Sequence, residues 1–258
     1  MRQVIDQMGR CVWVPDEPKR IISLVPSQTE LLYDLGIREE LVGLTKFCIH
    51  PKGLKKDKTI VGGTKTYKFD VIRSLKPDLI IGNKEENEQE GIEHLADEFP
   101  VWMSDISNLS EALQMINEVG ALVNKKPDSE KIVASISNSF SNLKSDKIEK
   151  VVYLIWHDPM MVAGKGTFIN DMLERCHFQN LLEDKRYPSL TIDDLKALSP
   201  DRILLSSEPF PFKAKHIEAY QTICPNAKIQ LIDGEMFSWY GTRLLKAPDY
   251  FRTLLSKS

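Results

Sequence analysis

The feature that most constrains the fold of this chain is a short pattern that occurs twice. Residues 70–81, DVIRSLKPDLII, pair position by position with residues 193–204, DDLKALSPDRIL, at an offset of 123 (193 minus 70). Each copy begins with an acidic residue that opens a short helix, followed by a Leu-x-Pro-Asp turn and an apolar strand. Because proline pushes the preceding residue out of helical geometry, each helix must stop at the turn. Two such copies predict two similar lobes, and a cleft between lobes commonly holds a ligand.

Composition narrows the function classes. The chain is 42% hydrophobic and 28% charged, which is ordinary for a soluble globular protein. Its formal net charge of −3 gives no case for binding nucleic acid or an anionic membrane surface. No apolar run approaches the roughly 20 residues of a membrane span, so we expect no direct membrane insertion. The expected partner is therefore a small molecule, and we expect a monomer.

The first residues bear on location. Met1–Gln7 is polar and lacks the apolar stretch of a secretory signal. As encoded, the chain is expected to be cytoplasmic, and it is expected to be periplasmic if a signal segment has been removed. The four cysteines, Cys11, Cys48, Cys176 and Cys224, contain no CxxC pair, so we expect reduced, mostly buried thiols.

Strands and helices alternate in both halves, which predicts an α/β fold with mainly parallel sheets. Apolar residues from Leu109 to Val123 keep helical spacing, and a second, more polar helical pattern runs from about Ser129 to Lys147. A helix with so many polar residues suits a bridge between two bodies. The predicted division is an N-terminal lobe (1–126), a bridging helix (127–149) and a C-terminal lobe (150–258).

Three segments, in this order and spacing, resemble a known family: PKRIISLVPSQTEL (18–31), LKPDLI (75–80) and AGK (163–165). The chain resembles the helical-backbone (class III) periplasmic substrate-binding proteins of ABC importers, which carry cobalamin, haem and ferric siderophores. The likeness extends from about Gly9 to the C-terminus and is closest to the cobalamin-binding member. It implies two Rossmann-like lobes joined by one long helix, with the ligand in the cleft and little closure.

The resemblance also implies a docking feature. In the cobalamin-binding member, one surface glutamate on each lobe meets arginines of the membrane permease. The matching positions here are Asp70 and Asp193, the first residues of the two repeats. Two acids on pseudo-symmetric lobes suit a dimeric permease. The alternative is that each merely opens a helix, where a negative charge is favourable.

The sequence differs from the cobalamin-binding member at positions that contact the ligand. Two tryptophans that flank the corrin fall at Thr64 and Ser189 here, so the cleft wall differs at both points. The family disulfide lacks its second cysteine, because Cys176 matches one partner and Thr253 stands at the other position. These departures leave the identity of the ligand open. We expect a ligand that contains cobalt or iron, and no intrinsic cofactor.

Candidate ligand contacts follow the strands, because loops at the carboxyl ends of parallel strands line the cleft. In the N-terminal lobe they are Phe47, Cys48, Lys65, Tyr67 and Lys84. The loop with Gly62 and Gly63 lets a ligand approach backbone N–H groups, or is a plain turn.

Cys48 and His50 are soft and borderline metal ligands, but two residues apart in a loop they are weak candidates, and a structural use is the alternative. No metal site is predicted.

In the C-terminal lobe the candidates are Trp156, His157, Phe210, Phe212, Trp239, Tyr240 and Arg243. Trp156 is the leading ligand contact, with core packing as its alternative. Phe210 and Phe212 are rigid surfaces for a planar ligand or anchors of their own loop. Arg243 pairs with a ligand carboxylate in a bidentate contact or with an internal acid. His157 is a further weak metal candidate.

Three functions are compatible with these residues. The first is a binding protein for a bulky metal chelate or tetrapyrrole that serves an ABC importer, without turnover. The second is a cytoplasmic metal-chelate carrier or sensor on the same fold. The third, an enzyme that uses Cys48, His50 and His157, ranks last because the sequence shows no assembled triad, phosphate loop or metal motif.

Overall fold

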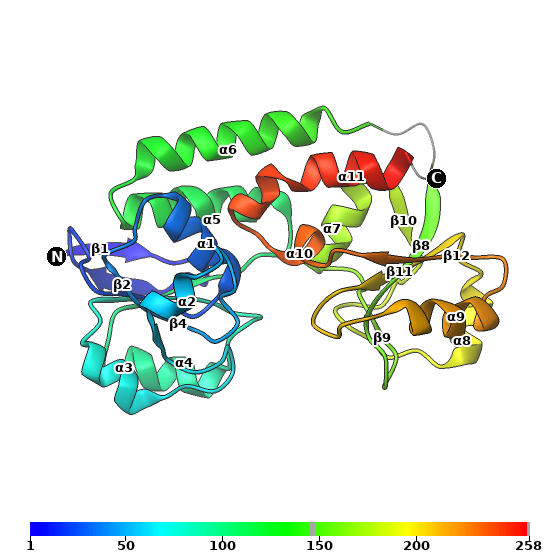
Figure 1. The fold of residues 1–258 in the computed structure, drawn as a ribbon. Helices are drawn as coiled ribbons and strands as arrows, with labels where there is room; N and C mark the ends of the chain where they lie inside the picture. Colours follow the sequence, from blue (N-terminus) through cyan, green and yellow to red (C-terminus); the bar gives the residue numbers. More distant parts are fainter. Residues whose placement is uncertain (145–147, 257–258) are drawn as a thin grey trace. The chain divides into compact units, whose positions relative to one another are not determined.

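The computed structural model describes residues 1–144 and 148–256 (Figure 1). The chain divides into two compact units. The first comprises residues 1–106, 110–137 and 240–245, and the second comprises residues 107–109, 138–239 and 246–258. The helix α6, Lys126–Ser141, contributes residues to both units.

The first unit is built on a five-stranded sheet in the order β5-β4-β3-β6-β7, in which each pair of neighbouring strands is parallel. A separate antiparallel hairpin, β1 with β2, precedes it. The strands and helices of this part of the chain are β1 (Arg2–Ile5), β2 (Cys11–Val14), β3 (Ile21–Ser23), α1 (Pro26–Asp34), β4 (Leu41–Leu44), α2 (Leu54–Asp57), β5 (Thr59–Ile60), α3 (Phe69–Leu75), β6 (Leu79–Asn83), α4 (Gln89–Ala96), β7 (Val101–Ser104), α5 (Leu109–Leu122) and the 3-10 helix η1 (Thr242–Leu245).

The second unit also has a mainly parallel sheet, in the order β10-β8-β11-β12, with β9 antiparallel to β8. Its elements are β8 (Glu149–Trp156), β9 (Met161–Val162), α7 (Phe168–Arg175), β10 (Phe178–Asn180), α8 (Ile192–Leu198), β11 (Arg202–Ser206), α9 (Ala214–Ile223), β12 (Lys228–Ile232), α10 (Glu235–Ser238) and α11 (Ala247–Ser256). The predicted α/β fold with parallel sheets is confirmed.

The central strands are apolar because both of their faces are covered. Every residue of β6 and of β11 is buried, which is typical of parallel strands with helices on both sides. Each unit has its own hydrophobic core, one around Ile22, Ile72 and Ile80, the other around Val152, Leu195 and Ile203.

The repeated sequence forms the same turn in both units. The helices α3 and α8 end one residue before the pre-proline position, and Lys76 and Ser199 take left-handed φ angles of 45° and 47°. The aspartate after each proline then holds the start of the neighbouring strand. Asp78 accepts hydrogen bonds from the backbone N–H of Arg20 at 2.8 Å, and Asp201 accepts one from Lys150 at 2.8 Å.

The predicted bridging helix is shorter in the structure. The helix α6 ends at Ser141, and residues 145–147 of the predicted range lie outside the described residues. Side chains compete for the backbone acceptor at this end, since Ser141 Oγ and Asn142 Nδ2 both donate to the carbonyl of Asn138, at 2.9 and 2.8 Å. Such local hydrogen bonds disfavour continuation of a helix.

Candidate ligand-binding edges

The predicted ligand residues of the first unit lie at the carboxyl edge of its sheet. Phe47 and Cys48 follow β4, Lys65 and Tyr67 follow β5, and Lys84 follows β6. Because these strands are parallel, their carboxyl ends share one edge. These residues therefore lie at one edge of the sheet, and their role as ligand contacts stays a prediction.

Phe47 is the exposed aromatic ring of this edge. Its side chain is 49% exposed, and the Nζ atom of Lys46 lies 5.0 Å from the ring centroid. The glycine loop lies against it, because a Cβ atom on Gly63 would come within 3.3 Å of the Phe47 ring. Gly62 has a φ of 127°, where its own Cβ would lie 2.2 Å from the carbonyl oxygen of Thr66. The loop therefore needs glycine for its turn.

Tyr67 is half-buried beneath the same loop. Its hydroxyl donates a hydrogen bond to the carbonyl of Thr64 at 2.7 Å, and burial raises the pKa of Tyr67 to about 12. The two lysines of the edge are exposed, and Lys84 forms an ion pair with Asp105 at 2.6 Å.

Cys48 is fully buried, in contrast to Phe47. Its Sγ atom lies 3.1 Å from the Thr29 hydroxyl and 3.3 Å from that of Thr45. Burial raises the pKa of the Cys48 thiol, so the thiolate needed by a nucleophile or a metal ligand is disfavoured. His50, two residues on, is half-buried.

The second unit gathers aromatic rings at the carboxyl edge of its sheet. Trp156 ends β8, and Phe210 and Phe212 follow β11. The Trp156 and Phe210 centroids are 5.5 Å apart, those of His157 and Phe210 5.7 Å, and those of Phe210 and Phe212 4.8 Å. Such spacings are typical of favourable aromatic pairs.

The exposure of these rings differs. Trp156 is 38% exposed, whereas Phe212 is buried in the core of the unit. The indole N–H of Trp156 donates to the carbonyl of Asp158 at 3.0 Å, so the ring faces are what Trp156 offers. Phe212 anchors the loop, and Trp156 with Phe210 forms the outer part of the cluster.

Two members of this cluster were missed by the sequence analysis, His216 and Tyr220 of α9. The His157 ring centroid lies 5.0 Å from that of His216, and its Nδ1 atom lies 3.1 Å from the Tyr220 hydroxyl. Their separation of four positions puts both on one helix face. That spacing was the available signal, but it does not reveal which loop the face contacts.

Trp239 and Tyr240 are buried, at 7% and 5% exposure. The Trp239 indole donates to Glu208 Oε1 at 2.9 Å, and the Ser238 hydroxyl donates to the same oxygen at 2.6 Å. Burial raises the pKa of Glu208, although these hydrogen bonds lower it. Glu208 was also missed by the sequence analysis.

Arg243 forms the internal salt bridge that was one of its two predicted alternatives. Within the first unit, its Nη2 and Nε atoms donate to the two carboxylate oxygens of Glu30 at 2.8 and 3.1 Å. Both residues are 6% exposed. A bidentate contact of this kind uses the fork geometry that would otherwise hold a ligand carboxylate.

The side chains of the two predicted docking acids are exposed to solvent. The side chain of Asp70 is 100% exposed and that of Asp193 is 96% exposed. Each lies three residues from a basic partner on its own helix, Arg73 at 3.2 Å and Lys196 at 3.9 Å. Pairs this exposed contribute little to stability, so both carboxylates are accessible to another protein.

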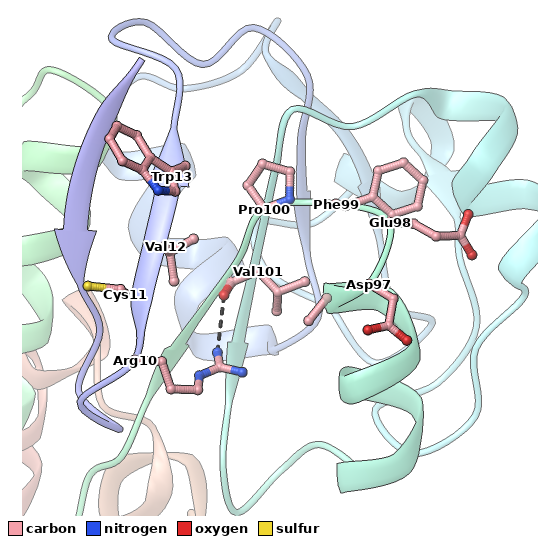
Figure 2. A pocket seen from close by; sticks show the side chains of 10 residues that line it. Arg10, Cys11, Val12, Trp13, Asp97, Glu98, Phe99, Pro100 and Val101 are labelled. Carbon is pink, nitrogen blue, oxygen red and sulfur yellow. Dashed lines mark hydrogen bonds between the residues drawn. The ribbon is translucent and has the colours of Figure 1, made fainter.

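A cavity lies in each of the two units. The first, of about 350 Å³, runs between the hairpin residues Arg10–Trp13 and the segment Ala96–Val101 at the amino end of β7 (Figure 2). In Figure 2 the Arg10 guanidinium reaches across to the carbonyl of Val101 at 3.1 Å. The second, of about 540 Å³, is lined by leucines and acids near α8. None of the predicted ligand contacts lines either cavity, but Ser189, one of the two positions assigned to the cleft wall, lines the second cavity and pairs with Met161 of β9.

The chain matches the family model for periplasmic binding proteins over residues 21–224. It belongs to this family. It is 28% identical over 226 residues to an uncharacterised ABC transporter substrate-binding lipoprotein, YvrC, of Bacillus subtilis, which covers 83% of this chain and 70% of that protein. It is 22% identical over 242 residues to a vitamin B12-binding protein of Pectobacterium atrosepticum, with 89% and 86% covered. The predicted family resemblance is confirmed.

Solved structures of periplasmic binding proteins share the fold. A periplasmic haem-binding protein of Pseudomonas aeruginosa superimposes with a TM-score of 0.81 at 20% identity, covering 93% of this chain and 94% of the other. The periplasmic vitamin B12-binding protein BtuF of Vibrio cholerae has a TM-score of 0.76 at 20% identity, covering 94% and 98%.

Two further features of the described residues concern the requirements of a metal site and of a membrane-spanning helix. Among residues 1–144 and 148–256, no group of three or more His, Cys, Asp and Glu side chains is arranged to hold a metal ion. Across the same residues, no helix combines the length and apolar character that a membrane crossing requires.

Proposed function

We propose that this chain is the substrate-binding protein of an ABC importer and that its ligand is a bulky metal chelate or a tetrapyrrole of the cobalamin, haem or ferric-siderophore type. The family, and relatives named for vitamin B12 and haem, support the ligand class. The observation that carries the proposal is the pair formed by the exposed ring of Trp156 and the half-buried ring of Phe210 at the carboxyl edge of the sheet. It offers the flat, apolar contact that a planar macrocycle needs.

The metal in such a ligand belongs to the cargo. Cys48, which was offered as a metal ligand on sequence grounds, is fully buried, and burial raises the pKa of its thiol. We therefore propose binding without turnover. The relatives named above are binding proteins, which supports this assignment.

We further propose that Asp70 and Asp193 dock the protein on its permease. Their exposed carboxylates lie in the first turns of α3 and α8, the equivalent helices of the two repeats. This role requires a location on the outer side of the membrane, which fractionation of the native host tests. Recovery only with the cytoplasm would contradict the docking role.

The ligand is identified by absorbance titration of the purified protein with hemin, cyanocobalamin and a ferric siderophore. We expect one class to bind with submicromolar affinity and Trp156→Ala to weaken it about tenfold, the size of one lost aromatic contact. The matched control is Trp13→Ala, an exposed tryptophan on β2 outside both edges. Equal effects of the two substitutions, or no binding of any class, would contradict the proposal.

A further inference from the structure

His157 lies at the carboxyl edge of the sheet in the second unit, where its ring forms a hydrogen bond with a buried tyrosine. The Nδ1 atom is 3.1 Å from the hydroxyl of Tyr220. Tyr220 is 2% exposed, and burial raises its pKa to about 12. The tyrosine therefore keeps its proton at neutral pH, and one hydrogen bond links a neutral phenol to an imidazole.

The direction of this hydrogen bond follows from burial. In the described part of the chain, the contact with His157 is the single hydrogen bond found for the Tyr220 hydroxyl. A buried O–H group left without an acceptor is costly, whereas an oxygen with an unused lone pair is tolerated more readily. Tyr220 is therefore the donor and Nδ1 of His157 is the acceptor. A neutral imidazole that accepts at Nδ1 carries its proton on Nε2.

The neighbouring histidine has the same tautomer for a stricter reason. Nδ1 of His216 accepts a hydrogen bond from the backbone N–H of Lys213 at 2.8 Å, and a backbone amide can only donate. The neutral ring of His216 thus also carries its proton on Nε2. His216 is buried, while His157 is exposed. The Nε2–H group of His157 is the one that a ligand can reach.

We propose that His157 recognises an oxygen atom on the periphery of the ligand, a carboxylate or an amide carbonyl, by donating a hydrogen bond from Nε2, and does not coordinate the metal. This inference rests on the proposed function. Metal binding requires a lone pair on the ligating nitrogen, and Nε2 has none in this tautomer. With the indole N–H of Trp156 occupied, Trp156 offers its ring for stacking and His157 offers the hydrogen-bond donor beside it.

The tautomer is measured first, without any ligand. In histidine labelled with 15N, two-bond 1H–15N correlations at a pH of about 8, above the ordinary His pKa of about 6.5, report which ring nitrogen is protonated. We expect an Nε2–H signal that disappears in His157→Gln. Tyr220→Phe is expected to give a mixture of tautomers, and Tyr250→Phe, which removes another hydroxyl of the unit, to change nothing. An Nδ1–H tautomer in the parent protein would overturn the inference.

The recognised atom is measured second. Hemin and metal-free protoporphyrin IX carry the same carboxylates and differ in the metal. We expect His157→Leu to weaken both by the same factor, about tenfold, and His157→Gln to restore part of the loss because its amide also donates. His94→Leu, an exposed histidine of the first unit, is the control. A loss confined to hemin would show metal coordination and overturn the inference.

The two failures are distinguishable. If neither porphyrin, cyanocobalamin nor a ferric siderophore binds the parent protein, the proposed function fails. The inference then fails with it, whereas ligand binding by a protein whose His157 carries its proton on Nδ1 would overturn the inference and leave the proposed function standing.

Discussion

Arg243 and Glu30 form a bidentate ion pair across 213 positions of the chain. It joins the short helix η1 to α1, and both belong to the first unit. A carbon atom added to Gly241, just before η1, would lie 2.7 Å from the carbonyl oxygen of Ser27. The segment 240–245 therefore packs closely against α1.

Removing one partner of this pair should be strongly destabilising. We expect Arg243→Met to lower the free energy of unfolding by about 3–5 kcal/mol, because it leaves a buried carboxylate without its cation. Urea unfolding followed by circular dichroism measures the change. In the double variant Glu30→Gln with Arg243→Met, most of the loss should be recovered.

The control is Arg252→Met, which breaks an exposed pair with Asp249 on α11. That variant should change stability by no more than about 1 kcal/mol. Equal losses for the exposed and the buried arginine would contradict the role given to Arg243.

The repeated turn predicts a repeated energetic cost. The carboxylates of Asp78 and Asp201 accept backbone N–H bonds at the start of β3 and of β8. Each substitution to alanine should cost about 1.5–3 kcal/mol, the range for hydrogen bonds to a charged group. Asp193→Ala is the matched control, since its side chain is 96% exposed. Chemical denaturation of the three variants gives the comparison, and a loss as large in Asp193→Ala would contradict it.

Substitution of the docking acids Asp70 and Asp193 should reduce uptake without changing ligand affinity. Charge reversal at Asp70 or Asp193 is expected to leave ligand affinity and stability unchanged, because both side chains are solvated. Uptake of the identified ligand by cells that contain the importer should fall, since like charges across an interface repel. Lys196→Glu, beside Asp193, controls for a general change of surface charge. Uptake unaffected by either reversal would remove the docking role.

The sequence predicted those parts of the fold that local chemistry decides. The proline turns, the buried strands β6 and β11 and the positions of Trp156 and Phe210 all follow from short stretches of sequence. The sequence did not identify Glu30 as the internal acid that pairs with Arg243. The helix α1 begins at Pro26, with Val25 as its N-cap, so Glu30 falls in the second turn and faces Arg243.

What the sequence missed depends on contacts between distant residues. The strand β1 was not predicted, because its polar residues show no strand pattern until they pair with β2. Arg2 is further held by the carbonyls of Ala121 and Leu122, at 2.7 and 2.9 Å. The pairs of Tyr220 with His157 and of Glu208 with Trp239 likewise join separate loops and helices. Spacing along the chain cannot reveal such partners.

The buried carboxyl of Glu208 makes stability depend on pH in a definite direction. Its pKa is raised in the folded protein, chiefly by burial, so between the ordinary value of about 4.3 and the raised one the folded state binds more protons than the unfolded state. Stability therefore falls as pH rises through this window. Glu208→Gln keeps an acceptor for Trp239 and removes the charge. The Tm of Glu208→Gln minus the Tm of the parent protein should therefore increase as pH rises. Glu183→Gln, on the exposed surface, should show no such trend, and a difference that stays constant with pH would show that Glu208 titrates normally.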